Sequence, residues 1–95
     1  MDSGADKQLA RRALSDEIFL RRLTVEEALL RLDEYLDGAF MAGLSRVRVI
    51  HGKGEGLLRQ AVRERLAKHS LVKSYRLGGY GEGGDGVTIV ELVHR

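Results

Sequence analysis

Cysteine and proline are both absent from this 95-residue chain, and it contains no long apolar run. Without cysteine, neither a disulfide nor a thiolate metal site can form, which fits a protein of the reducing cytoplasm. A membrane-spanning helix needs roughly 18 consecutive apolar residues, and no segment approaches that length. No signal peptide is visible either. These absences argue against a disulfide-stapled secreted fold and against a membrane partner.

The charges are unevenly distributed along the chain, although the formal net charge is only +2. Residues 24–43 carry five acids and one base, a net charge of −4, whereas residues 44–76 carry nine bases and two acids, a net charge of +7. A basic surface is what a polyanion binds, and the plain alternative is a solvated surface of mixed charge. Because the basic segment includes the glycine-rich residues 51–56, we favour a nucleic-acid partner.

Hydrophobic periodicity predicts one domain with two helices and four strands. Thr24 and Glu27 match a capping box, and apolar residues then recur at three- and four-residue steps as far as Phe40, with Gly43 placed to end the helix. The segment 78–86 has six glycines in nine residues, which indicates a mobile loop.

The expected elements are a strand at 18–21, a helix at 25–40, a strand at 46–51, a helix at 55–68, and strands at 71–77 and 87–93. Residues 1–15 are expected to form a linker or fraying helix ahead of a domain at 16–95. This order predicts an α/β fold: a two-layer sandwich, βαβαββ, in which a four-stranded mixed sheet packs against two helices. The near-continuous apolar character of the last strand predicts that it is buried.

The segment His51-Gly52-Lys53-Gly54-Glu55-Gly56 joins a predicted strand to a predicted helix. A glycine-rich turn leaves the first amide groups of the helix uncovered, so these donors and the helix dipole attract anions. Lys53 adds a positive charge, and His51 titrates near neutrality. The spacing matches neither Gly-x-x-x-x-Gly-Lys-Ser/Thr nor Gly-x-Gly-x-x-Gly, which excludes two common nucleotide-binding loops. We interpret this segment as a phosphate-facing turn; the alternative is a tight connection without a ligand.

The first two strands would end at the same edge of the sheet if they are parallel. Ligands collect at the carboxyl ends of strands in open α/β sheets. Arg21, His51 and Lys53 would then lie within reach of one another, although 30 residues separate the first two in the sequence. The sequence therefore predicts one basic site built from two strand ends.

Three motifs, taken together and in order, resemble the small MutS-related (Smr) domain family. They are Leu23-Thr24-Val25-Glu26-Glu27-Ala28, His51-Gly52-Lys53-Gly54, and Gly86-Val87-Thr88-Ile89-Val90-Glu91-Leu92. The resemblance covers about residues 17–93. It implies a two-layer α/β sandwich similar to the C-terminal domain of a bacterial translation initiation factor. It also implies DNA binding and, in many members, nicking endonuclease activity, with a preference for branched DNA in the group linked to suppression of homologous recombination. That group further implies that the domain is part of a larger MutS-like ATPase chain.

The chain departs from this family at the first motif, Leu-Asp-Leu-Arg/His-Gly. The matching residues are Ile18-Phe19-Leu20-Arg21-Arg22. Arg21 is kept, whereas Phe19 replaces the acid and Arg22 replaces the glycine. Phe19 can neither bind a metal nor accept a proton, so we expect it to impair cutting and to pack beside the site.

The resemblance nevertheless assigns a site to the remaining residues. His51 would act as general acid or base, while Arg21, Lys53 and the turn amides would stabilise charge in the transition state. The expected catalytic positions are Arg21, His51 and Phe19, the last as the position of the family acid. The expected DNA-binding residues are Arg21, Arg22, His51, Gly52, Lys53, Gly54, Gly56 and Arg59. Neither a metal site nor a cofactor is assigned.

The competing hypothesis is a module that binds DNA junctions or RNA without cutting. In that case Tyr80, on the glycine-rich loop, would stack on an exposed base. A binder of small phosphorylated molecules is a weaker alternative, because no apolar pocket for a ring is evident. The expected partner is DNA, including branched or junction DNA.

Overall fold

The computed structural model describes residues 15–94, so the linker or fraying helix expected at residues 1–15 lies almost wholly outside the described residues. The elements in chain order are β1 (Glu17–Phe19), α2 (Val25–Met41), β2 (Arg46–Ile50), α3 (Leu57–Lys68), β3 (Val72–Leu77), a short 3₁₀ helix η1 (Gly84–Gly86) and β4 (Val87–Leu92). This order confirms the predicted βαβαββ arrangement.

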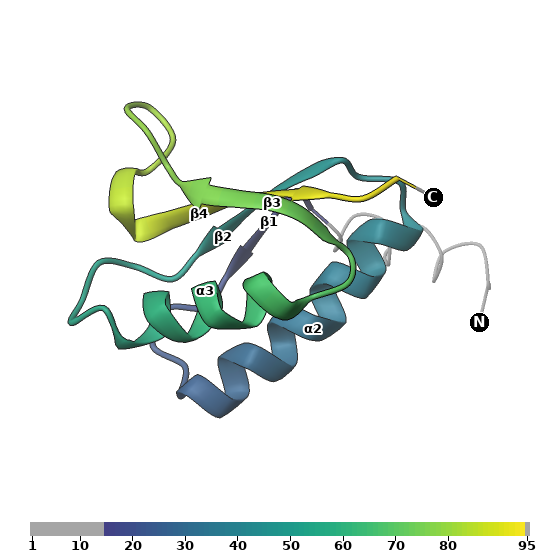
Figure 1. The fold of residues 1–95 in the computed structure, drawn as a ribbon. Helices are drawn as coiled ribbons and strands as arrows, with labels where there is room; N and C mark the ends of the chain where they lie inside the picture. Colours follow the sequence, from purple (N-terminus) through teal and green to yellow (C-terminus); the bar gives the residue numbers. More distant parts are fainter. Residues whose placement is uncertain (1–14, 95) are drawn as a thin grey trace, which may run out of the picture.

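The four strands form one mixed sheet in the order β1-β2-β4-β3. β1 and β2 are parallel, whereas β4 is antiparallel to both of its neighbours, β2 and β3. Both helices cover the same face of the sheet, so the fold has two layers, as predicted (Figure 1). The other face, which we call the open face, carries no helix.

The boundaries differ from the prediction at two places that matter for the site. β1 ends at Phe19 rather than at Arg21, although the Leu20 amide still donates to the Ile50 carbonyl at 2.8 Å. The chain turns at Arg22, whose φ is +69°. α3 begins at Leu57 rather than at Glu55, because Gly56 has a left-handed backbone with φ of +85°, which a helical residue cannot adopt.

Helix α2 has the predicted signals at both ends. The Glu27 amide donates to Thr24 Oγ1 at 3.1 Å, and the Thr24 amide donates to Glu27 Oε1 at 3.0 Å, which completes the capping box. At the other end, Gly43 has φ of +81° and the Leu44 amide donates to the Ala39 carbonyl at 3.0 Å. This is a Schellman ending, in which glycine occupies a conformation that costs other residues energy.

The hydrophobic core lies between the sheet and the two helices. Strand β4 is buried along almost its whole length, as predicted for the last strand. The fully buried side chains come from α2, β2, α3 and β4 and from Leu20, just after β1: Leu20, Leu32, Leu36, Val47, Val49, Val62, Leu66, Val90 and Leu92. An ion pair between Arg65 and Asp33 adds a polar link between α3 and α2.

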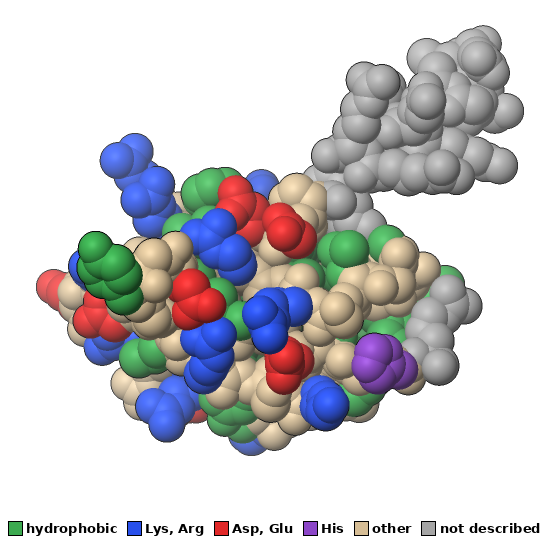
Figure 2. All heavy atoms as spheres, turned by 90° about the horizontal axis from the view of Figure 1, so that it is seen from above, with side chains coloured by type: hydrophobic (Ala, Val, Ile, Leu, Met, Phe, Trp, Pro, Cys, Tyr) green, Lys and Arg blue, Asp and Glu red, His purple; other side chains and the backbone are tan. Residues whose placement is uncertain are grey.

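The open face carries ion pairs rather than a continuous basic surface. Figure 2, which views this face, shows Lys and Arg side chains interspersed with Asp and Glu. Arg46 pairs with Glu91 at 3.2 Å, and Arg48 pairs with Glu17 at 2.6 Å. Several cations of the predicted basic segment are therefore paired within the protein, and fewer are available to a ligand.

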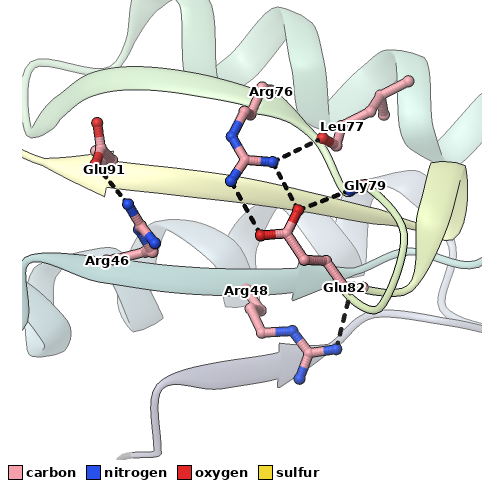
Figure 3. A network of polar contacts seen from close by, with 7 residues as sticks. All are labelled: Arg46, Arg48, Arg76, Leu77, Gly79, Glu82 and Glu91. Atoms are coloured by element: carbon pink, nitrogen blue, oxygen red, sulfur yellow. Dashed lines mark hydrogen bonds and ion pairs between the residues drawn. The ribbon is translucent and has the colours of Figure 1, made fainter.

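Glu82 fastens the glycine-rich loop 78–86 to this open face (Figure 3). Arg76 donates to both carboxylate oxygens of Glu82, at 2.7 and 3.0 Å, and the Gly79 amide donates to Oε1 at 2.7 Å. These hydrogen bonds, that from Arg76 first, lower the pKa of Glu82 to about 2. Arg48 also donates to the Glu82 carbonyl at 3.3 Å. The loop that the sequence predicted as mobile is thus tied to β2 and β3.

Neither α2 nor α3 combines the length and apolar character that a membrane-crossing helix needs, and these are the long helices of the described part of the chain.

Candidate nucleic-acid interface

Three chain connections meet at one edge of the sheet. Because β1 and β2 are parallel and β4 runs against β2 and β3, the carboxyl ends of β1, β2 and β3 all lie at the edge where β4 begins. The segments that leave these ends are residues 20–24, residues 51–56 and the loop 78–86. This confirms the prediction that the first two strands end together, and it adds the glycine-rich loop to the same edge.

The turn at residues 51–56, which we call the glycine turn, is fastened to the end of this loop. The amides of His51 and Gly52 both donate to the Gly86 carbonyl, at 3.1 and 2.9 Å. These two amides are therefore directed into the protein. The remaining donors of the turn lie farther along, where Gly56 precedes α3 and no side chain caps the helix. An anion approaching this edge would meet the uncapped start of α3.

The His51 side chain is buried, with only 4% of its surface exposed. Its Nδ1 lies 2.9 Å from the Gly52 carbonyl oxygen, and its Nε2 lies 2.8 Å from Thr88 Oγ1 on β4. A carbonyl can only accept, so Nδ1 carries the hydrogen, and in the neutral ring Nε2 accepts the Thr88 hydroxyl. Burial lowers the pKa of His51, outweighing the bond to Gly52, and nearby Arg59 lowers it further. The ring is therefore neutral at pH 7.

Arg21 lies against the glycine turn, as expected. A Cβ atom on Gly52 would come within 3.1 Å of both Cγ and Cδ of Arg21, so the aliphatic part of this side chain covers Gly52. Arg21 has no ion pair among residues 15–94. Its guanidinium is exposed and available to a phosphate.

Lys53 and Arg59 share one carboxylate, that of Asp85. Lys53 Nζ lies 3.8 Å and Arg59 Nη1 lies 3.7 Å from the Asp85 oxygens. Arg59 also reaches Gly56, where an added Cβ would lie 3.0 Å from Nη2. Asp85 is more than half exposed, so these contacts are weak and open to competition. A phosphate could take the place of Asp85 between the two cations.

Phe19 does not pack as expected. Its side chain is 57% exposed at the end of β1, on the open face. The expectation that it fills space beside the site is therefore wrong: β1 is an edge strand, and no helix covers this side of it. Arg22 lies in the left-handed region, and it is the one non-glycine residue with positive φ in the described part of the chain. A glycine at this position would meet no such strain.

Thr88 also lines a groove of about 920 Å³ between α3 and β3. Gly56, Arg59, Arg63, Tyr75 and Asp85 are among the other residues that line it. Among residues 15–94, no three His, Asp or Glu side chains lie together in a way that could hold a metal ion.

Sequence reasoning missed two polar residues of this site, Thr88 and Asp85. Thr88 sits opposite Val49 in the β2–β4 ladder, which brings it beside the end of β2 and His51. Asp85 is placed by η1, which precedes β4. The sequence did offer one indication: Asp85 and Thr88 flank the start of the last strand, which begins at the end of the sheet where β1 and β2 finish.

The fold and the glycine turn agree with a known family. A model of the Smr domain matches residues 18–93, and the chain belongs to the Smr domain family. Its start and end fall close to the limits expected from the three sequence motifs.

Two relatives of this chain are much longer proteins. The chain is 57% identical over 79 residues to a protein named Endonuclease MutS2 from Clostridium botulinum, and 60% identical over 81 residues to one of the same name from Symbiobacterium thermophilum. These matches cover 83% and 85% of this chain but 10% of each relative. The chain thus spans about a tenth of the length of these relatives.

Two crystal structures share the fold. The Smr domain of Thermus thermophilus MutS2 has a TM-score of 0.79 and 52% identity, covering 81% of this chain and 96% of that one. YdaL, a stand-alone small MutS-related protein from Escherichia coli, has a TM-score of 0.78 and 28% identity, covering 84% of this chain and 65% of that one. The second similarity extends the same architecture to a protein with lower sequence identity.

Proposed function

We propose that this domain binds DNA at the edge formed by the glycine turn. We further propose that it derives from nicking endonucleases and that its own cutting activity is impaired. The observation that carries the proposal is the convergence of Arg21, Lys53 and Arg59 on one turn with an uncapped helix behind it. Fixed cations and free backbone donors at a helix start are a general means of holding phosphate. The relatives named Endonuclease MutS2 also support a role in DNA binding and cutting.

Cutting a phosphodiester requires a proton acceptor for the attacking water and stabilisation of the extra negative charge. Arg21 and Lys53 are suited to the second task. His51 Nε2 is suited to the first, but the Thr88 hydroxyl lies between it and the groove. In our proposal the water gives its proton to Thr88 Oγ1 while Thr88 gives its own proton to Nε2.

The missing carboxylate is what impairs the reaction in this proposal. An acid at position 19 would stand two residues before Arg21 and beside Ile50, on the face of the sheet opposite Thr88, so it would act on Arg21 and the phosphate rather than on the water that Thr88 contacts. Phe19 offers no lone pair for that purpose. Asp85 is the carboxylate nearest to the cations, but it is occupied with Lys53 and Arg59.

Nicking of supercoiled plasmid tests the chemistry. The unaltered chain would be compared with Phe19→Asp and with Phe19→Asp combined with Arg22→Gly. We expect the restored acid to increase the rate by roughly 10²- to 10⁴-fold, the usual contribution of a positioned acid or base, with little change in DNA affinity. Equal rates in all three proteins would remove the acid from the mechanism.

The salt dependence of DNA affinity tests the binding site independently of cutting. Each neutralised phosphate contributes about −0.9 to the slope of log K against log salt on duplex DNA. Arg21→Ala and Lys53→Ala should each weaken binding and reduce this slope by about 1 without lowering the melting temperature. Affinity that does not change with salt would rule out phosphate contacts.

A second candidate function is binding of DNA junctions or RNA without cutting. One observation favours it: the position expected to hold the acid presents a 57% exposed aromatic ring instead. A competition assay with a DNA junction, a DNA duplex and an RNA hairpin of the same length shows whether the domain prefers junction DNA or RNA. Failure of Phe19→Asp to produce any nicking would favour this function over the first.

We further propose that the domain works within a longer MutS-like ATPase chain in the cytoplasm, in DNA repair or recombination. The relatives, about ten times longer than the matched segment, support this proposal. Expression of the longer gene product with and without the domain, followed by measurement of recombination frequency, would test it.

A further inference from the structure

The exposed Phe19 ring stands close in the chain to two exposed arginines. Phe19 is the last residue of β1, and its neighbour in the sheet register is Ile50, directly before the glycine turn. Arg21 and Arg22 follow within three residues and are both exposed. Neither has an ion pair within residues 15–94. An exposed aromatic ring is thus followed, two and three residues later, by two exposed cations without an ion pair in the described part of the chain.

An aromatic ring exposed to this extent does not contribute to the core. Burying a Phe side chain stabilises a fold, and Phe19, which is more than half exposed, forgoes most of that gain. A ligand that covers the ring would recover it. The neighbouring cations require that this ligand be negatively charged, so a flat ring carrying a phosphate meets both conditions.

We propose that Phe19 stacks on an unpaired nucleobase whose phosphate is held by Arg21 and the glycine turn. The inference rests on the proposed DNA-binding function and specifies its ligand as a single-stranded nucleotide at a fork, gap or end. A base within a duplex has both faces covered by its neighbours and cannot offer one to Phe19. The ring thereby gives this site a preference for DNA that carries an unpaired strand.

The replacement of a carboxylate by Phe19 is consistent with such a role. An acid at this position repels the phosphate groups that Arg21 and Arg22 attract. A phenyl ring adds no repulsion and supplies a stacking surface that tolerates any base, because every base has a π-face. Phe19 then adds affinity for unpaired strands at the position where the acid needed for cutting is missing.

Tyr80, the residue that the competing hypothesis assigns to base stacking, provides a matched comparison. It is also a fully exposed aromatic residue, on the loop that leaves the same edge of the sheet. However, Tyr80 is separated from Arg21 in sequence and belongs to the segment fastened by Glu82. Replacement of either ring by Leu removes one exposed aromatic group and leaves every charge unchanged.

The test measures affinity for two labelled DNAs, a blunt duplex and the same duplex with a single-stranded arm, using the unaltered chain, Phe19→Leu and Tyr80→Leu. Loss of stacking on one base is expected to weaken forked-DNA binding of Phe19→Leu by at least about fivefold, with blunt-duplex binding unchanged. If Phe19 rather than Tyr80 is the stacking residue, Tyr80→Leu should bind both DNAs as the unaltered chain does.

A fluorescent variant gives a direct readout. The chain contains no tryptophan, so Phe19→Trp introduces a single indole at the proposed stacking position. We expect its emission to be quenched by the forked DNA and not by the blunt duplex. Equal loss of affinity for both DNAs in Phe19→Leu, or loss in Tyr80→Leu alone, would overturn the stacking inference and leave the DNA-binding function standing. Absence of binding to either DNA by the unaltered chain would overturn both.

Discussion

Thr88 holds His51 in place from the neighbouring strand: its Oγ1 lies 2.8 Å from the imidazole Nε2, and both side chains are almost fully buried. Together with the Gly52 carbonyl on Nδ1, this bond occupies both ring nitrogens. The Gly52 carbonyl determines which nitrogen is protonated, and the Thr88 hydroxyl directs the ring toward β4. His51 thereby connects the glycine turn to the centre of the sheet.

The first prediction concerns this bond. Thr88→Val keeps the shape of the side chain but removes the donor, which leaves a buried imidazole nitrogen without a partner. We expect the free energy of unfolding to fall by about 1–3 kcal/mol. Thr88→Ser loses a methyl group but keeps the hydroxyl, so the ¹⁵N shifts of the His51 ring should be preserved in this variant and altered in Thr88→Val. Urea unfolding and NMR provide the two measurements, and unchanged ring shifts in Thr88→Val would contradict the assignment.

The second prediction is a pH dependence of stability. The pKa of His51 is lowered in the folded state, mainly by burial, whereas in the unfolded chain it is about 6.5. The unfolded chain therefore binds the proton more readily. The contribution of His51 to stability should be complete above pH about 6.5 and be lost as the pH falls through the folded pKa.

Urea unfolding between pH 8 and pH 5 measures this dependence. His51→Gln has no group that titrates at this position, so its stability should fall less over the same range. Glu82, whose pKa is about 2, loses its own contribution only at much lower pH and does not confuse the comparison. An equally steep fall in His51→Gln would mean that other groups cause it.

The third prediction concerns Asp85, which shares its carboxylate between Lys53 and Arg59. Asp85→Asn should increase DNA affinity severalfold, because it frees two cations and removes a charge that repels phosphate. Asp37→Asn, on the exposed surface of α2, changes the net charge by the same amount and serves as the control. Equal gains in the two variants would attribute the effect to net charge alone.

The fourth prediction uses the positive φ of Arg22. Arg22→Gly and Arg22→Ala remove the same cation, but only glycine relieves the left-handed backbone. We expect Arg22→Gly to be more stable than Arg22→Ala by about 1 kcal/mol, while both bind DNA equally weakly. Thermal unfolding together with a binding titration of both proteins checks this, and equal stabilities would show that the turn relaxes at no cost.

The fifth prediction separates the glycine turn from the glycine-rich loop. Gly54 and Gly81 both have positive φ, and a Cβ atom on either would meet nothing within 4 Å. Gly54→Ala should weaken DNA binding more than Gly81→Ala, because only Gly54 lies where a phosphate approaches the backbone. Gly83 would be a poor control, since a Cβ there would lie 2.4 Å from Val87 Cγ2 and would disturb the fold. Equal binding by the two alanine variants would show that the glycine turn only connects β2 to α3 and does not contact a phosphate.

The sequence was informative where local patterns determine the structure. The capping box at Thr24, the glycine at position 43 and the alternation of Val47 and Val49 specify their elements through nearby residues, and all were confirmed. The proximity of Arg21 to the glycine turn also followed, because it depends only on two strands being parallel.

Other features of the site depend on pairings that periodicity does not encode. Thr88 reaches His51 only through the register of β4 against β2, and Asp85 reaches Lys53 only because the loop returns to the same edge. The exposure of Phe19 depends on β1 being an edge strand with no helix over its outer face. Each of these requires the full strand order, which the sequence pattern leaves open.

The interior position of β4 means that this site is completed last. β4 lies between β2 and β3, yet it follows both of them in the chain. As a nascent chain leaves the ribosome, Arg21, His51 and Lys53 emerge while the Gly86 carbonyl and the Thr88 hydroxyl have still to be made. Until β4 inserts, β2 and β3 each present an unpaired edge, and the imidazole has no partner on Nε2. A chain that stops before residue 86 would therefore contain the basic segments without these two partners, and under the proposed function it could bind DNA only once β4 is in place.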